Sequence, residues 1–182
     1  MKVAIVIGHT KFKQGAYSRD LDTTEWKFNK MVAAHLKDIA TIFYYDSYNL
    51  GYTSMVKRNA KKINTGNFDL VLELHFNAAE SKQANGCEAL YYFKNQKGKR
   101  LADFFCNLIE KKMGRKNRGA KALFGKHQRG FAAVFYPNPT TLILEPFFGT
   151  NRSDANAFRD YKSIESYVSV IKETIKKFSY EV

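Results

Sequence analysis

The sequence predicts a single α/β domain in which a twisted, mainly parallel central sheet is flanked by helices. Three observations support this fold class. Strand-like and helix-like patterns alternate along all 182 residues, which is typical of layered folds with parallel strands. Several strand-like segments are apolar on both faces, as doubly buried strands are. The sequence contains no internal repeat or Pro/Ser-rich linker, so we expect residues 1–182 to form one domain.

The first expected strand is KVAIVIGH at residues 2–9. We interpret this N-terminus as a strand rather than a signal peptide, because its apolar stretch is only five residues long and lacks a small-residue cleavage site. A helix is expected from Thr23 or Thr24, either of which can act as an N-cap, to about Asp38. Its expected apolar side consists of Trp26, Met31, Ala34 and Ile39.

The remaining elements follow from the same patterns. Further strands are expected at 40–46, 68–76, 86–93, 130–136 and 140–146. Further helices are expected at 53–62, 98–113 and about 160–178. The last helix has one apolar stripe, which we expect to pack on the sheet rather than on a membrane. The stripe consists of Val168, Ile171, Ile175 and Phe178. No segment approaches the roughly 18 apolar residues of a membrane span.

The strand at 68–76 carries a polar face that is unusual for a buried strand. Glu73 and His75 alternate with Leu72, Leu74 and Phe76, so the two polar side chains share one face. A carboxylate and an imidazole are costly to bury unless they find partners. The pattern therefore indicates a functional site at the end of this strand.

Two more expected strands end on polar residues that can bind metals. The apolar segment VAIVIGH ends on His9, LVLELH on His75, and TLILE on Glu145. Ligands bind at the carboxyl ends of strands in open α/β sheets. Glu25 lies in the first turn of the following helix, and the loop before it is long enough to return to His9. Two imidazoles and one carboxylate form a catalytic zinc site, and the other carboxylate can serve as the base.

The net charge of +13 is concentrated in one stretch of the chain. The basic stretch 94–129 contains twelve Lys/Arg and two acidic residues, which gives +10 in 36 residues. Such a face attracts nucleic acid, an anionic membrane or an anionic cell wall, although a solvated face without a specific partner is the alternative. His127 lies in this stretch, in FGKHQRG, and nothing in the sequence requires it to approach a substrate. We expect His35, inside the first helix, to be structural.

Four motifs in order resemble the zinc-dependent N-acetylmuramoyl-L-alanine amidases of the type-3 family, which open bacterial peptidoglycan. The motifs are VIGH with Gly15–Ala16 and Glu25, SMVKRNAKKIN at 54–64, DLVLELHFNAA followed by GCEALYY, and TTLILEPFFGTN. The resemblance covers almost the whole chain. It implies that His9, Glu25 and His75 bind one zinc ion per chain and that Glu145 is the general base.

The resemblance also implies cleavage of the amide between N-acetylmuramic acid and L-alanine. Asn77, Asn151 and Arg58 are candidates for binding the stem peptide, with a turn role as the alternative for the asparagines. Many family members carry a small polar residue in place of Glu73. Glu73 either accepts a hydrogen bond from a ligand imidazole, or pairs with Lys or Arg, or replaces Glu25 as a ligand. The last option is disfavoured, because Glu73 and His75 lie roughly 6.6 Å apart along the strand.

We therefore expect a monomeric amidase with no separate cell-wall-binding domain, whose basic stretch contacts anionic envelope polymers. A phage endolysin made in the cytoplasm without a signal peptide, and acting on the cell wall after release, fits best; an excised autolysin domain is the alternative. A second hypothesis is a zinc carboxypeptidase acting on stem peptides. A nucleic-acid binder is the third, but the sequence shows no helix-turn-helix, zinc-finger or RNA-reading aromatic motif, so we expect no nucleic-acid partner.

Overall fold

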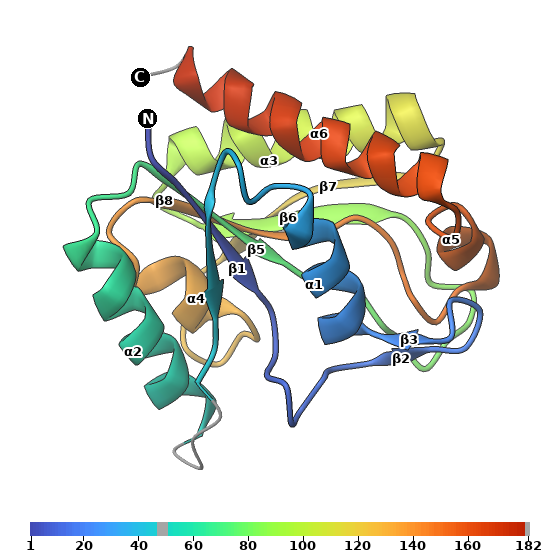
Figure 1. Cartoon of the computed structure of the whole chain (residues 1–182), viewed down its shortest axis with the longest axis horizontal. Coiled ribbons are helices and arrows are strands. Elements are labelled where there is room, and N and C mark those ends of the chain that lie inside the picture. The colour runs from blue at the N-terminus through green and yellow to red at the C-terminus, as the bar shows by residue number, and fades with distance from the viewer. Residues whose placement is uncertain (47–50, 181–182) are drawn as a thin grey trace.

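A six-stranded sheet forms the centre of this computed structural model, which describes residues 1–46 and 51–180 (Figure 1). Its strands are β1 (Val3–Ile7), β4 (Thr41–Tyr44), β5 (Leu70–Leu74), β6 (Cys87–Tyr92), β7 (Asn117–Leu123) and β8 (Thr140–Glu145). They lie in the order β4-β1-β5-β8-β6-β7. Every neighbouring pair is parallel except β6 and β8, which are antiparallel. The predicted fold class, an α/β domain with a mainly parallel sheet, is confirmed.

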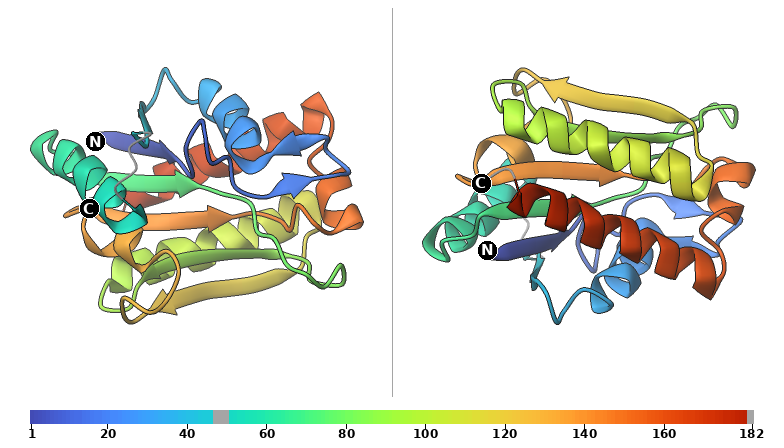
Figure 2. Two further views of the ribbon diagram at one scale, coloured as in Figure 1. Left: turned by 90° about the horizontal axis from the view of Figure 1, so that it is seen from below. Right: turned by 90° about the horizontal axis from the view of Figure 1, so that it is seen from above.

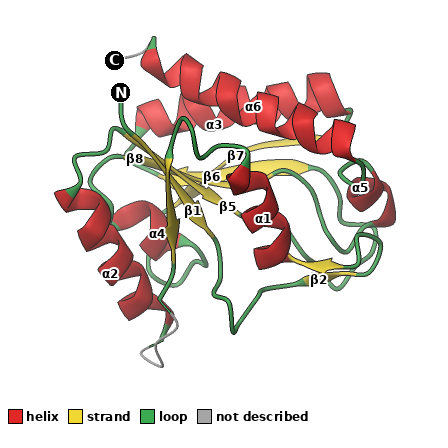
Figure 3. Ribbon diagram, viewed as in Figure 1, coloured by secondary structure: helices red, strands yellow, loops and turns green. Residues whose placement is uncertain are grey.

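Helices cover both faces of the sheet (Figure 3). They are α1 (Glu25–Ala34), α2 (Tyr52–Thr65), α3 (Gln96–Met113), α4 (Phe131–Phe135), α5 (Arg152–Asn156) and α6 (Tyr161–Ser179). The larger apolar cluster joins α1, α3 and α6 to one face, and the smaller cluster joins α2 and α4 to the other. Along β5, Leu70, Leu72 and Leu74 belong to the larger cluster, whereas Val71 belongs to the smaller one. The polar face of β5 is therefore the face that α2 and α4 cover.

The C-terminal helix packs as predicted. Val168, Ile171, Ile175 and Phe178 are all buried in the larger cluster, where α6 lies beside α3 (Figure 2). Asp160 caps the N-terminus of α6, and its side chain accepts a hydrogen bond from the backbone N–H of Ser163. In the described part of the chain, no helix has the length and apolar character needed to cross a membrane.

The first helix begins where it was predicted, but its buried face differs. Thr24 is the N-cap, and α1 ends at Ala34 rather than at Asp38. Met31 and Ile39 are exposed, so their assignment to the apolar side was wrong, and the same holds for Ala34. The residues that pack on the sheet instead recur with a helical period that includes Phe28. It consists of Trp26, Phe28, Asn29, Val32 and Ala33.

The segment between α3 and β8 also differs from the prediction. Residues 130–136, expected as a strand, contain the short helix α4, because a short apolar run does not distinguish a strand from a buried helix turn. The edge strand β7 is not predicted from the sequence. Its sequence NRGAKAL lacks apolar alternation, since most of its residues stay partly exposed at the edge of the sheet.

A small hairpin folds the chain back between β1 and α1. It consists of β2 (Tyr17–Ser18) and β3 (Thr23–Thr24), in which Tyr17 pairs with Thr24. The backbone N–H of Glu25 then donates to the carbonyl of Ala16 at 2.9 Å. The hairpin thereby returns the start of α1 towards the end of β1.

Candidate metal centre and its cleft

Four predicted site residues meet at one edge of the sheet. Strands β1, β5 and β8 are neighbours and parallel, so their carboxyl ends converge. His9 follows β1, His75 directly follows β5, and Glu145 is the last residue of β8. Glu25 reaches the same edge as the first residue of α1. The topology alone thus explains why residues far apart in the sequence share one site.

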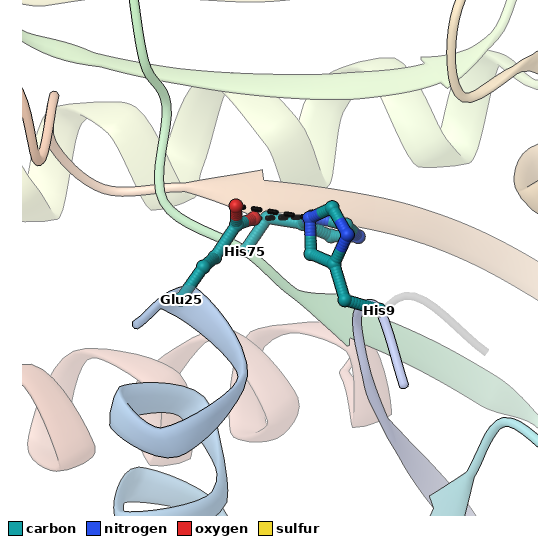
Figure 4. A group of neighbouring side chains, drawn as sticks. All are labelled: His9, Glu25 and His75. Carbon is teal, nitrogen blue, oxygen red and sulfur yellow. Dashed lines mark hydrogen bonds and ion pairs between the residues drawn. The ribbon is translucent and has the colours of Figure 1, made fainter. Parts of the chain in front are cut away.

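His9, Glu25 and His75 form a cluster that can hold a metal ion (Figure 4). One ligand atom from each residue lies within 4.8 Å of the others. The Nε2 atom of His9 is 2.9 Å from Oε2 of Glu25, and Nδ1 of His75 is 2.6 Å from Oε1 of Glu25. The cluster does not include Glu73, which was the alternative third ligand.

The carboxylate of Glu25 is held in place on several sides. It is almost fully buried, and it accepts backbone N–H donors from Ala16 at 3.2 Å and from Phe76 at 3.3 Å. Burial raises its pKa, but hydrogen bonds to His75 and His9 outweigh burial and lower the pKa to about 2. Glu25 therefore stays ionised at any ordinary pH and provides the negative charge that a cation needs.

His75 is placed between two carboxylates. Its Nε2 atom lies 2.9 Å from Oε1 of Glu73, on the opposite side of the ring from Glu25. Burial lowers the pKa of His75, but the hydrogen bonds to Glu25 and Glu73 hold that pKa well above its ordinary value. Without a metal ion, the imidazole is therefore protonated, and a divalent cation at Nδ1 would have to replace that proton.

Two glycines make room for the cluster. A Cβ atom on Gly8 would lie 2.3 Å from the ring of His75. A Cβ atom on Gly15 would lie 2.5 Å from His9 Cδ2 and 2.6 Å from Glu25 Oε2, and Gly15 also has a φ of +75°. The VIGH and GA motifs therefore contain glycine because side chains at these positions would displace the candidate ligands.

Glu145 differs from Glu25 in its hydrogen bonding. Its Oε2 atom is buried, and it has no hydrogen-bond partner within the described residues. Burial raises the pKa of Glu145 to about 8, the charge of His75 lowers it, and the charges of Glu25 and Glu88 raise it. A carboxyl group with a raised pKa and a free lone pair suits proton transfer near neutral pH.

Glu88, which was not among the predicted site residues, lies beside Glu145 on the neighbouring strand. Because β6 runs antiparallel to β8, the start of β6 lies at the same edge, and Glu88 pairs with Glu145. The carboxylate of Glu88 accepts hydrogen bonds from Asn77 Nδ2 and from Arg118 Nε, each at 2.7 Å. The alternation in GCEALYY placed Glu88 on a definite strand face, but only the antiparallel pairing brings it to the site.

These groups open onto one cleft of about 720 Å³. Its floor contains the metal-competent cluster together with Glu145 and Glu88. Aromatic side chains of α2 and α4, together with the loop between β7 and α4, line the walls. Residues Lys126, His127 and Arg129 of that loop face the cleft, so the basic stretch 94–129 reaches it.

The candidate substrate-binding residues separate into two groups. Asn77 lines the cleft, and its amide is bound to Glu88. Asn151 is the N-cap of α5, its amide donates to the carbonyl of Lys82, and it is not among the cleft-lining residues. Arg58 lies on the exposed side of α2, also outside the lining. His35 is exposed after α1, with its ring 6.3 Å from that of Tyr161.

The donor set fits a catalytic zinc ion. Two imidazole nitrogens and one carboxylate oxygen converge, and such a set would hold a catalytic zinc ion together with one water. Each ring nitrogen already contacts the carboxylate of Glu25, and all three ligand atoms lie within 4.8 Å of one another. The second ring nitrogen of His75 meets a carboxylate, an arrangement typical of histidines that bind zinc.

We predict that Gly15→Ala weakens metal binding far more than Gly119→Ala. The two glycines have nearly the same φ, +75° and +76°, so both variants carry similar backbone strain. Only the Gly15 Cβ collides with His9 and Glu25, whereas no atom lies within 4 Å at Gly119. Zinc titration of the two purified variants checks this. Equal affinities in both variants would contradict the role given to Gly15.

A second prediction concerns the stability of the metal-free chain. Because the folded pKa of Glu145 is about 8, the folded state keeps a proton that the unfolded state loses above about pH 4.5. Glu145 therefore costs stability that grows as pH rises from about 4.5 to 8. Glu145→Gln removes this cost. The free energy of unfolding of the variant should therefore rise relative to that of the wild type by up to about 5 kcal/mol between pH 4.5 and 8. Urea unfolding of both proteins at pH 4.5, 6 and 8 measures this difference in free energy of unfolding. A difference that does not change with pH would contradict the prediction.

Known proteins show the same fold. The catalytic domain of the CD27L endolysin, which targets Clostridia difficile, is 27% identical over 97% of both chains, with a TM-score of 0.78. The CwlD amidase of Clostridioides difficile is 19% identical over the full length of both chains, with a TM-score of 0.81. The catalytic domain of CwlV, an amidase of Bacillus (Paenibacillus) polymyxa, is 19% identical over 98% of both chains, with a TM-score of 0.77.

Comparisons of sequence agree with these structural similarities. The amidase LytC of Bacillus subtilis is 27% identical over 106 residues, which are 57% of this chain and 20% of LytC. The matched part thus spans about one fifth of that relative's length. A family model described as N-acetylmuramoyl-L-alanine amidase matches residues 3–177. The chain therefore belongs to the type-3 family of N-acetylmuramoyl-L-alanine amidases, as its four motifs indicated.

Proposed function

We propose that residues 1–182 form a monomeric, zinc-dependent amidase that hydrolyses the bond between N-acetylmuramic acid and L-alanine in bacterial peptidoglycan. The observation that carries the proposal is the cluster of His9, Glu25 and His75 on the floor of a cleft that also contains Glu145. Family membership supports the choice of substrate.

His9 Nε2, His75 Nδ1 and a carboxylate oxygen of Glu25 would hold the zinc ion. When bound, zinc lowers the pKa of a coordinated water to about 7 and polarises the scissile carbonyl. The backbone N–H groups of Ala16 and Phe76 hold the carboxylate of Glu25 in place as a ligand. The remaining chemistry falls to side chains that contact water and substrate.

Glu145 acts as the general base. Its buried and unpartnered Oε2 accepts a proton from the attacking water and then passes that proton to the departing amine of L-alanine. A nearby cation lowers the pKa of a carboxyl group, so Glu145 is ionised and ready to accept a proton when the centre is loaded. Asn77, whose amide donates to Glu88, contributes polar contacts to the stem peptide. Asn151 and Arg58 do not line the cleft, so the proposal gives them no contact with the substrate.

Digestion of purified peptidoglycan tests the proposal. We predict release of new N-terminal alanine amines without new reducing sugars, and loss of this activity in excess chelator. Glu145→Gln should keep zinc but lose activity by about 10²- to 10⁴-fold, because only the proton acceptor is removed. Exposed Glu165→Gln, on α6, serves as the control and should leave turnover unchanged. Normal turnover in Glu145→Gln would reject its role.

The products of the same digestion distinguish the amidase from the second candidate function, a zinc carboxypeptidase. A carboxypeptidase with the same ligand set would release free amino acids from the ends of stem peptides and create no alanine amines. That product pattern would overturn the amidase assignment while leaving the metal centre intact.

We further propose that the basic stretch 94–129 holds the enzyme on anionic envelope polymers. The stretch includes α3, the edge strand β7 and the loop that reaches the cleft, which can be followed by colour in the ribbon (Figure 2). Exposed Lys116 and Lys121 belong to it but do not line the cleft, so they can be changed without altering the catalytic groups. Attraction between exposed charges is screened beyond about 8 Å at physiological ionic strength, so binding should weaken with salt.

We predict that Lys116→Gln/Lys121→Gln lowers affinity for isolated cell walls about two- to tenfold at low salt. The control pair, Lys27→Gln/Lys37→Gln, removes the same charge from exposed positions in and just after α1. Sedimentation with isolated cell walls at several salt concentrations measures the affinity of both double variants. Salt-independent binding, or equal losses in the two pairs, would contradict a role for the basic stretch.

The endolysin role is also part of the proposal. Of the structures compared above, the endolysin catalytic domain has the greater identity, 27% against 19% for the two bacterial amidases. We propose that the chain is made in the cytoplasm of an infected cell and reaches the wall through a membrane lesion.

A further inference from the structure

A buried chain of hydrogen bonds extends from the candidate metal ligand His75 into the protein. Oε1 of Glu73 lies 2.9 Å from Nε2 of His75, and the hydroxyl of Tyr45 donates to Oε2 of Glu73 at 2.7 Å. Glu73 is 2% exposed and Tyr45 is 6% exposed. Both oxygens of this carboxylate are therefore engaged in directed contacts, away from solvent.

The two ring nitrogens of His75 face different groups. Nδ1 faces Glu25 and the metal-competent cluster, whereas Nε2 faces Glu73. When Nε2–H donates to Glu73, the lone pair of the neutral imidazole lies on Nδ1, which is the nitrogen that points to the cluster. A ring turned over or carrying its proton on Nδ1 would lose this donor–acceptor match.

Tyr45 in turn fixes the carboxylate. Burial, followed by the negative charge of Glu73, holds the pKa of Tyr45 well above its ordinary value, so the phenol keeps its proton and remains a donor. Tyr45 directly follows the last residue of β4, and β4 pairs with β1, so the donor is anchored to the same sheet as the metal ligands. The hydrogen bond leaves Glu73 little freedom to rotate away from His75.

We propose that Glu73 is a positioning residue for the metal centre, and that Tyr45 holds Glu73 in the orientation that fixes the tautomer and ring angle of His75. The inference rests on the proposed zinc site. It deepens that site by adding two residues, neither of which touches the metal or the substrate. Carboxylates behind metal-bound histidines typically strengthen metal binding by 10- to 100-fold.

The alternative is that Glu73 is only a buried polar group with a structural role. The two explanations predict different results for Glu73→Met, which has a similar length but no acceptor. If Glu73 acts only in packing, the apolar side chain should leave metal affinity unchanged. If Glu73 positions His75, zinc affinity should fall about 10- to 100-fold, and Glu73→Gln, whose amide oxygen still accepts from Nε2–H, should recover most of it.

The test is zinc affinity of the metal-free chain, measured by competition with a chromophoric chelator. Tyr45→Phe removes one oxygen and should weaken zinc binding by less than Glu73→Met does. In the double variant, Tyr45→Phe should have no further effect, because its acceptor is already gone. Thr174→Val, which removes a buried hydroxyl that bonds to Val170 on α6, is the control for altered packing and should bind zinc normally.

Visible spectra of the cobalt-loaded variants give a second readout, because the d–d bands report the ligand geometry. Glu73→Met should shift these bands and Thr174→Val should not. If Glu73→Met does not fold, judged by circular dichroism, the comparison of Tyr45→Phe with Thr174→Val decides the question. Unchanged zinc affinity and unchanged spectra in Glu73→Met would overturn the inference. If Glu73→Met does not fold, the same result in Tyr45→Phe would overturn it.

These measurements use no substrate, so a result that contradicts the inference can be distinguished from one that contradicts the proposed function. A wild-type chain that binds no zinc at His9, Glu25 and His75 would contradict the proposed metal centre itself. A wild-type chain that binds zinc, together with variants at Glu73 and Tyr45 that bind it equally well, would contradict only the positioning role.

Discussion

The structure depends on the placement of one buried carboxylate, that of Glu25, between two imidazoles. An ionised carboxylate is expensive to remove from water, and here the cost is offset by two ring nitrogens and two backbone N–H groups. The opposite charge must then come from a proton on His75 or from a metal ion. The parallel sheet, the hairpin after β1 and the two neighbouring glycines all serve to bring these groups together.

The order of the strands explains the electrostatic differences within the cleft. The parallel neighbours β1, β5 and β8 deliver His9, His75 and Glu145 to one edge. The antiparallel strand β6 adds Glu88 beside Glu145, where Arg118 and Asn77 satisfy it and leave Glu145 with an unpartnered oxygen. Two carboxyl groups at the same edge therefore differ in protonation. Glu25 stays ionised, whereas Glu145 titrates near neutral pH in the metal-free chain.

Much of this architecture could be predicted from the sequence, because the central strands are apolar on both faces and end on polar residues. The convergence of His9, Glu25 and His75 follows from those strand ends and from the position of Glu25 at the start of a helix. The partners of the site could not be predicted in the same way. Tyr45 and Glu88 reach it only through strand order and direction, which local patterns do not encode. The errors at 117–123 and 130–136 have a local cause: an edge strand shows no apolar alternation, and a short apolar run fits either a strand or a helix.

The proposed function requires that one zinc ion is bound by His9, Glu25 and His75. Anomalous diffraction from crystals of the zinc-loaded chain, recorded at the zinc absorption edge, tests it most directly. We predict a single strong peak about 2.0–2.2 Å from Nε2 of His9, Nδ1 of His75 and a carboxylate oxygen of Glu25. A peak at another place in the molecule, or a ligand set in which Glu73 replaces Glu25, would contradict it.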